Sequence, residues 1–164
     1  MLGVDVGGVI IDRASEDSDT SFFGENYLLT PPVPGAFKEL GDLTLRFGRR
    51  VHVISKCGPS VEGKTRSWLR SHDFFEITGI PTDNLHFVRT REEKAPICEA
   101  LGVTHFIDDR VDVLQSMTSV RNRVLFLGGN PPAMHPSDIP IYLAAARTWQ
   151  EITALIAVPH TATS

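Results

Sequence analysis

The sequence predicts an α/β fold, in which a mainly parallel sheet of five strands lies between two layers of helices, a three-layer α/β/α arrangement. Two observations lead to this prediction. Short apolar runs rich in β-branched residues recur along the chain, and each is followed by a turn with Gly, Ser or Asp and then by a segment of helical periodicity. Repeated strand–helix units of this kind form parallel sheets, because each helix carries the chain back across a face of the sheet.

The expected elements alternate regularly along the chain. The strands are Leu2 to Val6, Val51 to Ser55, Leu85 to Val88, His105 to Asp108 and Arg123 to Leu127. The helices, in which apolar residues recur at helical spacing, are Pro34 to Phe47, Ser60 to Ser71, Glu92 to Leu101, Val111 to Ser116 and Thr148 to Ile156. These elements fit a single domain over residues 1–158, and we expect residues 159–164 to be a disordered tail.

Two segments interrupt this alternation. Residues 12–34 contain acidic and hydroxyl residues followed by a Pro-rich stretch, so we expect an irregular flap directly after the first strand. The aromatic residues Phe22, Phe23 and Tyr27 of this flap either form part of a lid or a dimer contact, or pack on the core. Residues 130–140 are rich in Pro and predict a surface loop before the last helix.

Composition places the chain among ordinary soluble proteins. Its 164 residues are 41% hydrophobic and 22% charged, with a formal net charge of -4. That charge is too small to indicate a polyanion-binding surface, so we expect no obligatory nucleic-acid partner. Without a basic leader or a long apolar run, the chain is predicted to be cytoplasmic and to have no membrane partner. Cys57 and Cys98 lack the spacing of a disulfide framework or a zinc site and are interpreted as ordinary thiols.

The first strand ends in a residue of chemical interest. Ligands of open parallel sheets gather at the carboxyl ends of the strands. Asp5 stands at such an end and is followed by Gly7 and Gly8, where the backbone can turn sharply and let a ligand approach closely. Taken alone, Asp5 is equally well explained as an acceptor of turn hydrogen bonds.

The second strand delivers Ser55 and Lys56 to the same edge. A hydroxyl and backbone N–H groups at this place can bind a phosphate oxygen. With Gly8, where a ligand can approach the backbone, they form the predicted phosphate-binding set. The alternative for Ser55 is a helix cap or a turn residue.

The fourth strand ends in two adjacent acids, Asp108 and Asp109. Paired carboxylates at a buried strand end repel each other, and a hard divalent cation with oxygen ligands relieves this repulsion, so we expect a metal site here. Lys94 stands near the start of the preceding helix, where a cation is unfavourable for the helix dipole. We predict that Lys94 balances Asp5 and a substrate phosphate; the alternative is a surface lysine paired with a neighbouring glutamate.

In their order and strand context, these residues resemble the four motifs of the haloacid dehalogenase (HAD) superfamily of phosphohydrolases. The matching positions are Asp5-Val6-Gly7-Gly8-Val9, Ser55, Lys94 and Asp108-Asp109. The stretch from Glu93 to Asp109 is the most characteristic, being similar to the family's lysine helix and double-aspartate strand. The resemblance covers residues 1–129. It implies a Rossmann-like, HAD-like sheet in which the first strand lies between the second and the fourth, so that the four motifs meet at one edge.

The resemblance also implies a mechanism. Asp5 would be the nucleophile that forms an aspartyl-phosphate, which water then hydrolyses. Mg²⁺ would be bound by the Asp5 carboxylate, the backbone carbonyl of Gly7 and the carboxylate of Asp108. Asp109 would act on the metal directly or through water. Lys94 would neutralise charge during transfer of the phosphoryl group.

Gly7 departs from the family pattern Asp-x-Asp, whose second aspartate donates a proton to the leaving group and then accepts one from water. No side chain at Gly7 can do this, and general acid–base catalysis is worth about 10² to 10⁴ in rate. We therefore expect a slow phosphatase of phosphate monoesters, which would keep activity on substrates with good leaving groups. The alternative is an inactive module that binds phosphate, metal or a partner. The flap acids are interpreted as solvated charges rather than as replacement acids; they are Asp12, Glu16, Asp17 and Asp19.

The resemblance implies a capless protein, because no interval is long enough for the cap domain that family members often carry. An open site accepts a large phosphorylated substrate, or a second copy of the chain closes it over a small one, so a homodimer stays an open alternative. The dehalogenase branch of the same superfamily is a third interpretation. The Asp108–Asp109 pair and the missing cap argue against it.

Overall fold

The computed structural model describes residues 1–13, 21–128 and 136–156. Its strands are β1 (Leu2–Val4), β2 (Val51–Lys56), β3 (Leu85–Val88), β4 (His105–Asp108), β5 (Asn122–Phe126) and β6 (Ala144–Ala146). Its α-helices are α1 (Ala36–Arg46), α2 (Pro59–Ser71), α3 (Phe74–Thr78), α4 (Lys94–Leu101), α5 (Val111–Ser116) and α6 (Trp149–Ile156). Short 3-10 helices cover Tyr27–Leu29, Thr82–Asn84, Arg91–Glu93 and Pro136–Asp138.

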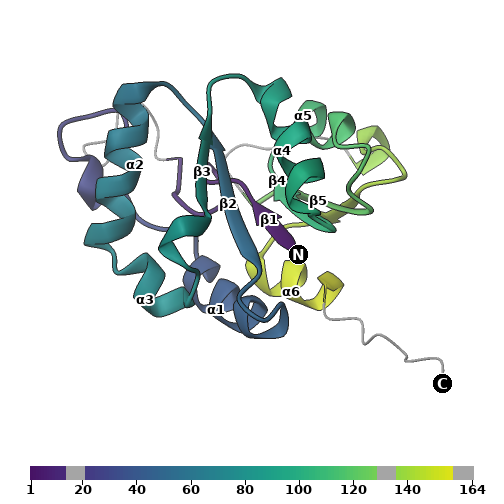
Figure 1. Cartoon of the computed structure of the whole chain (residues 1–164), viewed down its shortest axis with the longest axis horizontal. Helices are drawn as coiled ribbons and strands as arrows, with labels where there is room; N and C mark the ends of the chain where they lie inside the picture. The colour runs from purple at the N-terminus through teal and green to yellow at the C-terminus, as the bar shows by residue number, and fades with distance from the viewer. Residues whose placement is uncertain (14–20, 129–135, 157–164) are drawn as a thin grey trace.

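The strands form one sheet in the order β3-β2-β1-β4-β5-β6, and each of its neighbouring pairs is parallel. The strands run through the middle of the molecule with helices around them (Figure 1). The predicted α/β architecture with a parallel sheet is confirmed. The predicted position of the first strand, between the second and the fourth, is confirmed as well.

The prediction of five strands is wrong, because β6 adds a sixth strand beside β5. This strand consists of three alanines, Ala144–Ala146, which carry none of the β-branched or aromatic side chains that mark a strand in the sequence. Helix α3 was also not predicted. It is only five residues long, and the left-handed residues Asp73 and Gly79 bound it on both sides.

Two apolar clusters hold the three layers together. The larger cluster joins one face of the sheet to α1, α2, α3 and α6 and includes the fully buried Trp68 and Trp149. The smaller cluster joins the opposite face to α4 and α5 around Phe106. Successive residues of β2 enter different clusters, Val53 the first and Ile54 the second. This is the alternation of a strand that is buried on both faces.

The described part of the flap is irregular, as predicted. It begins and ends beside an isolated bridge between Ile11 and Pro32. Its 3-10 helix packs against α2, where the indole Nε1 of Trp68 donates a hydrogen bond to the carbonyl of Thr30 at 2.9 Å. The flap prediction for residues 14–20, most of the loop prediction for 130–140, and the predicted tail lie outside the described residues.

None of the helices in the described segments combines the length and the apolar character that crossing a membrane requires.

Candidate metal and phosphate site

Asp5 follows β1 directly and lies level with Asp108 on the neighbouring strand, because Val4 pairs with Ile107. The Asp5 amide donates to the Ile107 carbonyl at 3.0 Å, which extends the pairing to the residue itself. A tight turn follows, in which the carbonyl of Val6 accepts hydrogen bonds from three successive amides, those of Val9, Ile10 and Ile11. The turn ends the strand and leaves the Asp5 carboxylate, in a residue only 8% exposed, at the carboxyl edge of the sheet.

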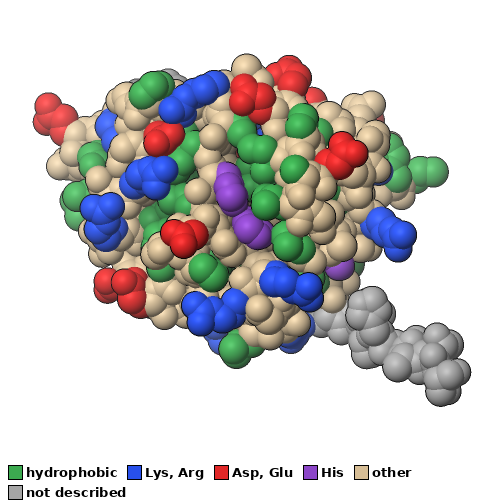
Figure 2. All heavy atoms as spheres, in the orientation of Figure 1, with side chains coloured by type: hydrophobic (Ala, Val, Ile, Leu, Met, Phe, Trp, Pro, Cys, Tyr) green, Lys and Arg blue, Asp and Glu red, His purple; other side chains and the backbone are tan. Residues whose placement is uncertain are grey.

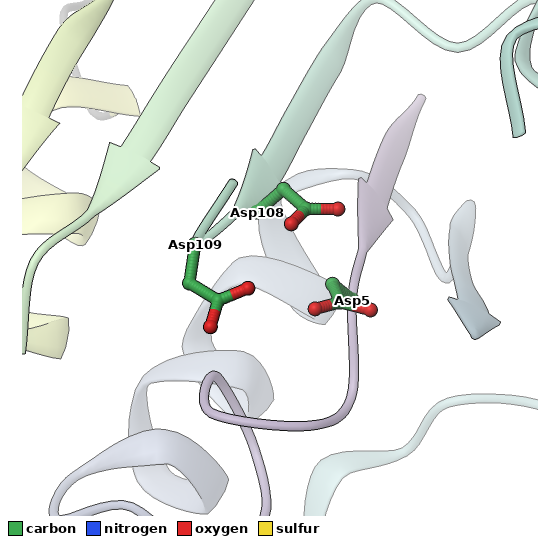
Figure 3. A group of neighbouring side chains, drawn as sticks. All are labelled: Asp5, Asp108 and Asp109. Carbon is green, nitrogen blue, oxygen red and sulfur yellow. The ribbon is translucent and has the colours of Figure 1, made fainter. Parts of the chain in front are cut away.

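Asp108 and Asp109 bring their carboxylates to the same place. One carboxylate oxygen from each of Asp5, Asp108 and Asp109 lies within 4.8 Å of the others. The three side chains point toward one another from the ends of β1 and β4 (Figure 3). This is the point where the strand order reverses, since β1 is followed in the sheet by β4 rather than by another early strand. Crevices at such points are the usual ligand sites of open parallel sheets.

Lys94 is buried between two of these acids. Its side chain is 3% exposed, and Nζ donates to Asp5 Oδ1 at 2.8 Å and to Asp108 Oδ2 at 3.0 Å. The alternative of a solvated surface lysine is therefore wrong. Burial opposes the charge of Lys94, but the charges and hydrogen bonds of Asp5 and Asp108 outweigh burial and raise its pKa above the ordinary lysine value. Lys94 is thus a fixed positive charge at neutral pH.

Asp108 and Asp109 are harder to deprotonate than ordinary aspartates, because the pKa of each is raised. Burial and the charge of Asp5 raise the pKa of Asp108 well above its usual range, against the opposing charge of Lys94. Burial and Asp5 also raise the pKa of Asp109, against the opposing charge of Arg13. Among the described residues, Asp109 Oδ1 is buried and has no hydrogen-bond partner. One carboxylate oxygen of Asp109 is therefore left without a hydrogen-bond donor in the described part of the chain, although Arg13 lies close to the other.

Arg13 is a member of the site that the sequence did not single out. Its Nη2 lies 3.2 Å from Asp109 Oδ2, and its side chain is 55% exposed. Arg13 could not be recognised from the sequence, because it lies in the irregular flap, where no periodicity indicates which way a side chain points. The only hint is its position in the segment that follows the first strand.

Gly7 and Gly8 occupy different environments in the turn. A Cβ added to Gly7 would have no atom within 4 Å, and the residue is exposed. Gly8 has a left-handed backbone with φ of 78°, and its added Cβ would lie 2.6 Å from Asp109 Oδ2 and 2.9 Å from Arg13 Nε. Gly8 is therefore needed for the close approach of the turn to the acid cluster. Position 7 has room for a side chain.

Ser55 and Lys56 lie at the predicted edge but make no hydrogen bond or ion pair with the three acids among the described residues. Ser55 is 7% exposed and Lys56 is exposed. Within β2 the Ser55 side chain shares the face of Val53, whereas Asp108 in β4 shares the face of Phe106. The two side chains thus leave the sheet on opposite faces. Ser55 can meet a ligand of Asp108 only over the end of the strands.

The flap aromatic residues lie along α2. Phe22 packs against the larger core cluster, while Phe23 is 71% exposed. Lys64 of α2 donates to the carbonyl of Phe23 at 3.4 Å and stands over the Tyr27 ring at 5.2 Å. Of the flap acids, Glu16, Asp17 and Asp19 lie outside the described residues.

A second group that the sequence did not single out is a histidine pair on β2 and β3. His52 Nδ1 and His86 Nε2 are 2.9 Å apart, and both rings are half-buried. Histidine side chains are visible over these strands in the middle of the face in Figure 2, where acidic and basic side chains are interspersed around them. The pair follows from the register of β2 and β3, which the sequence does not give.

Cys57 and Cys98 are both free and buried, as expected of ordinary thiols. Cys98 lies one helical turn after Lys94 in α4, and burial raises the pKa of the Cys98 thiol to about 12. Neither cysteine is a reactive thiolate at neutral pH, because burial raises the pKa of Cys57 as well.

No model of a known protein family matches the chain, and no curated protein matches it either.

Proposed function

We propose that this chain is a Mg²⁺-dependent phosphatase of the HAD type, which hydrolyses phosphate monoesters through an aspartyl-phosphate at Asp5. The observation that carries the proposal is the contact of buried Lys94 with Asp5 and Asp108, with Asp109 alongside them at the point where the strand order reverses. Phosphoryl transfer uses a nucleophilic carboxylate, a fixed cation and further acids placed close together.

The acid cluster fits a divalent cation. Three carboxylates face one another, and the buried Oδ1 of Asp109 has no hydrogen-bond partner among the described residues. Asp5, Asp108 and Asp109 would hold Mg²⁺, with the carbonyl of Gly7 as a further ligand, since hard cations take carboxylate and carbonyl oxygens. When bound, Mg²⁺ supplies charge neutralisation to a phosphate group beside Asp5.

The remaining residues have roles that follow from their places. Asp5 attacks phosphorus with the oxygen that Lys94 does not hold. Lys94 neutralises charge as the phosphoryl group passes between oxygens. Ser55, Lys56 and the turn at Gly8 bind phosphate oxygens from the ends of the strands. The proposed substrate is a phosphorylated small molecule or macromolecule, which enters an uncapped site.

A second candidate function is a non-catalytic module that binds phosphate or metal. Gly7 favours this candidate, because position 7 offers no side chain for proton transfer and is open to solvent. Such a module would bind Mg²⁺ or phosphate without turnover.

Hydrolysis of 4-nitrophenyl phosphate in the presence of Mg²⁺ tests the first candidate against the second. We expect slow turnover by the natural chain and none by Asp5→Asn. Asp83→Asn is a matched control, since Asp83 is exposed and precedes β3 at the opposite end of the sheet. Equal turnover by the natural chain and the Asp5→Asn variant would exclude Asp5 as the nucleophile.

A further inference from the structure

We infer that Asp5 is a stable phosphorylation site, which takes its phosphoryl group from an acyl phosphate and keeps it as a long-lived aspartyl-phosphate. The inference rests on the proposed function, because it uses Asp5 as the same nucleophile. It adds the class of donor and the fate of the covalent intermediate.

The first observation is the empty position beside the nucleophile. Gly7 is two residues after Asp5, is exposed, and has a backbone outside the left-handed region that glycine alone favours. A Cβ there would meet no atom within 4 Å. The turn thus has space for a proton-carrying side chain next to Asp5 and does not supply one.

The second observation is that each of the two nearby acids touches a cation. The carboxylates gathered with Asp5 in the described chain are those of Asp108 and Asp109. Lys94 holds Asp108 at 3.0 Å, and Arg13 holds Asp109 at 3.2 Å. Asp108 and Asp109 are also the proposed ligands of Mg²⁺. With the metal bound, the described site would offer fixed positive charge, while position 7 carries no side chain that moves protons.

The first chemical step does not need a proton when the donor is an acyl phosphate. An oxygen of Asp5 forms a bond to phosphorus, and the bond between phosphorus and the acyl oxygen breaks. The leaving carboxylate keeps the electron pair and needs no proton at neutral pH, because carboxylic acids have pKa values near 4. An alkyl phosphate would instead release an alkoxide, which requires a proton from a general acid.

The second step does need proton transfer. Water forms a bond to phosphorus, the bond to the Asp5 oxygen breaks, and the Asp5 carboxylate is regenerated while the water loses a proton. A general base accelerates such a step by about 10² to 10⁴. Without one at position 7, formation of the aspartyl-phosphate outruns its hydrolysis. The intermediate accumulates.

The full chain treated with acetyl phosphate and Mg²⁺ tests this inference by intact-protein mass spectrometry. We expect a mass increase of one phosphoryl group, removed by hydroxylamine and missing in Asp5→Asn. After removal of the donor, the adduct of the natural chain should outlast that of Gly7→Asp by about 10²-fold or more. Gly7→Asn adds a side chain of the same size without proton transfer, so its adduct should remain long-lived.

The outcomes separate the inference from the proposed function. An adduct on Asp5 that decays equally fast in the natural chain and in Gly7→Asp overturns the inference and leaves the phosphatase proposal standing. Consumption of acetyl phosphate by the natural chain without an accumulated adduct would also overturn the inference and leave the phosphatase proposal standing. This measurement does not depend on the folding of any variant. If neither an adduct nor donor consumption is found, both fail.

Discussion

Arg13 and Lys94 differ in solvent exposure, and this difference determines how each cation acts in the site. Lys94 is 3% exposed and contacts two acids, so its charge is held in place by the fold. Removing one partner of a buried ion pair typically costs about 3 to 5 kcal/mol, because the other charge is left uncompensated. Arg13 is 55% exposed and touches one acid, so solvent screens it and it can move away.

A divalent cation at the proposed site would therefore have to compete with Arg13 for Asp109. We predict that Arg13→Gln strengthens the binding of Mn²⁺, used as a spectroscopic substitute for Mg²⁺, by about 1.4- to fivefold. The size follows from the roughly 0.2 to 1 kcal/mol of an exposed ion pair. Electron paramagnetic resonance titration measures the affinity.

Arg89→Gln is the matched control for that prediction. Arg89 is 48% exposed and pairs with Glu62 of α2, so its loss changes the net charge equally without touching Asp109. Weaker Mn²⁺ binding in Arg13→Gln than in Arg89→Gln would show that Arg13 supports the cation site instead of competing for it.

We predict that alanine substitution changes the stability of the protein at only one of the two glycines of the turn. Gly8→Ala forces a left-handed residue and brings a Cβ to 2.6 Å from Asp109 Oδ2, so we expect it to lower the free energy of unfolding. Residues held in such backbone regions cost about 1 to 3 kcal/mol. Gly7→Ala meets no atom within 4 Å and should change stability by less than about 0.5 kcal/mol. Urea unfolding of both variants measures the difference, and equal stability would contradict it.

The sequence predicted some site residues more completely than others. Asp5, Asp108 and Asp109 could be placed at one edge because each ends a short apolar strand, and parallel strands end at the same side. The burial of Lys94 could not be derived from helical periodicity, since its partners come from β1 and β4. Arg13 could not be found at all, because its contact depends on the path of an irregular segment.

At the scale of elements, the pairing of β2 with β3 joins two titrating side chains. His52 and His86 share a hydrogen bond of 2.9 Å, and their rings stack at 5.1 Å with 30° between the planes. One ring must donate and the other accept, so the hydrogen bond requires at least one ring to be unprotonated. Burial lowers the pKa of both, and the neighbouring charge of His86 lowers that of His52 further.

This pair predicts a loss of stability on mild acidification. The unfolded histidines titrate near pH 6.5, and the folded ones at lower pH, so between these values the unfolded state binds more protons. The contribution of the pair is present above about pH 6.5 and is lost as the pH falls toward the folded values, with a slope of at most about 1.4 kcal/mol per pH unit for each histidine.

Urea unfolding between pH 5 and about 7.5 measures this slope. We expect a smaller slope in the double variant His52→Gln, His86→Gln than in the natural chain. An unchanged slope in the double variant would mean that acids, not this pair, set the pH dependence in that range.

The elements were predicted where their sequence pattern is strong. The bounds of β3, β4 and α5 agree with the expected ranges, and the other predicted elements differ by a few residues at their ends. The strand β6 and the helix α3 were missed for physical reasons. Three alanines have no strand preference of their own and adopt the extended form because β5 offers them hydrogen-bonding partners. The five residues of α3 are too few to show a helical period.

At the scale of the whole molecule, the sheet is built outward from the central strand β1 toward both edges. Strands β2 and β3 extend the sheet on one side of β1, and β4, β5 and β6 extend it on the other. The reversal between β1 and β4 thus places Asp5, Asp108 and Lys94 where open parallel sheets usually bind ligands.

The pairing of β1 with β4 also determines at which stage of protein synthesis the site around Asp5 can form. Leu2 pairs with His105, so the centre of the sheet cannot close until the ribosome has released more than half of the chain. Before that stage β1 can pair only with β2, and Asp5 is an ordinary hydrated acid at the end of an exposed edge. A nascent chain that stops before Lys94 has neither the counter-charge nor the neighbouring acids that make Asp5 unusual.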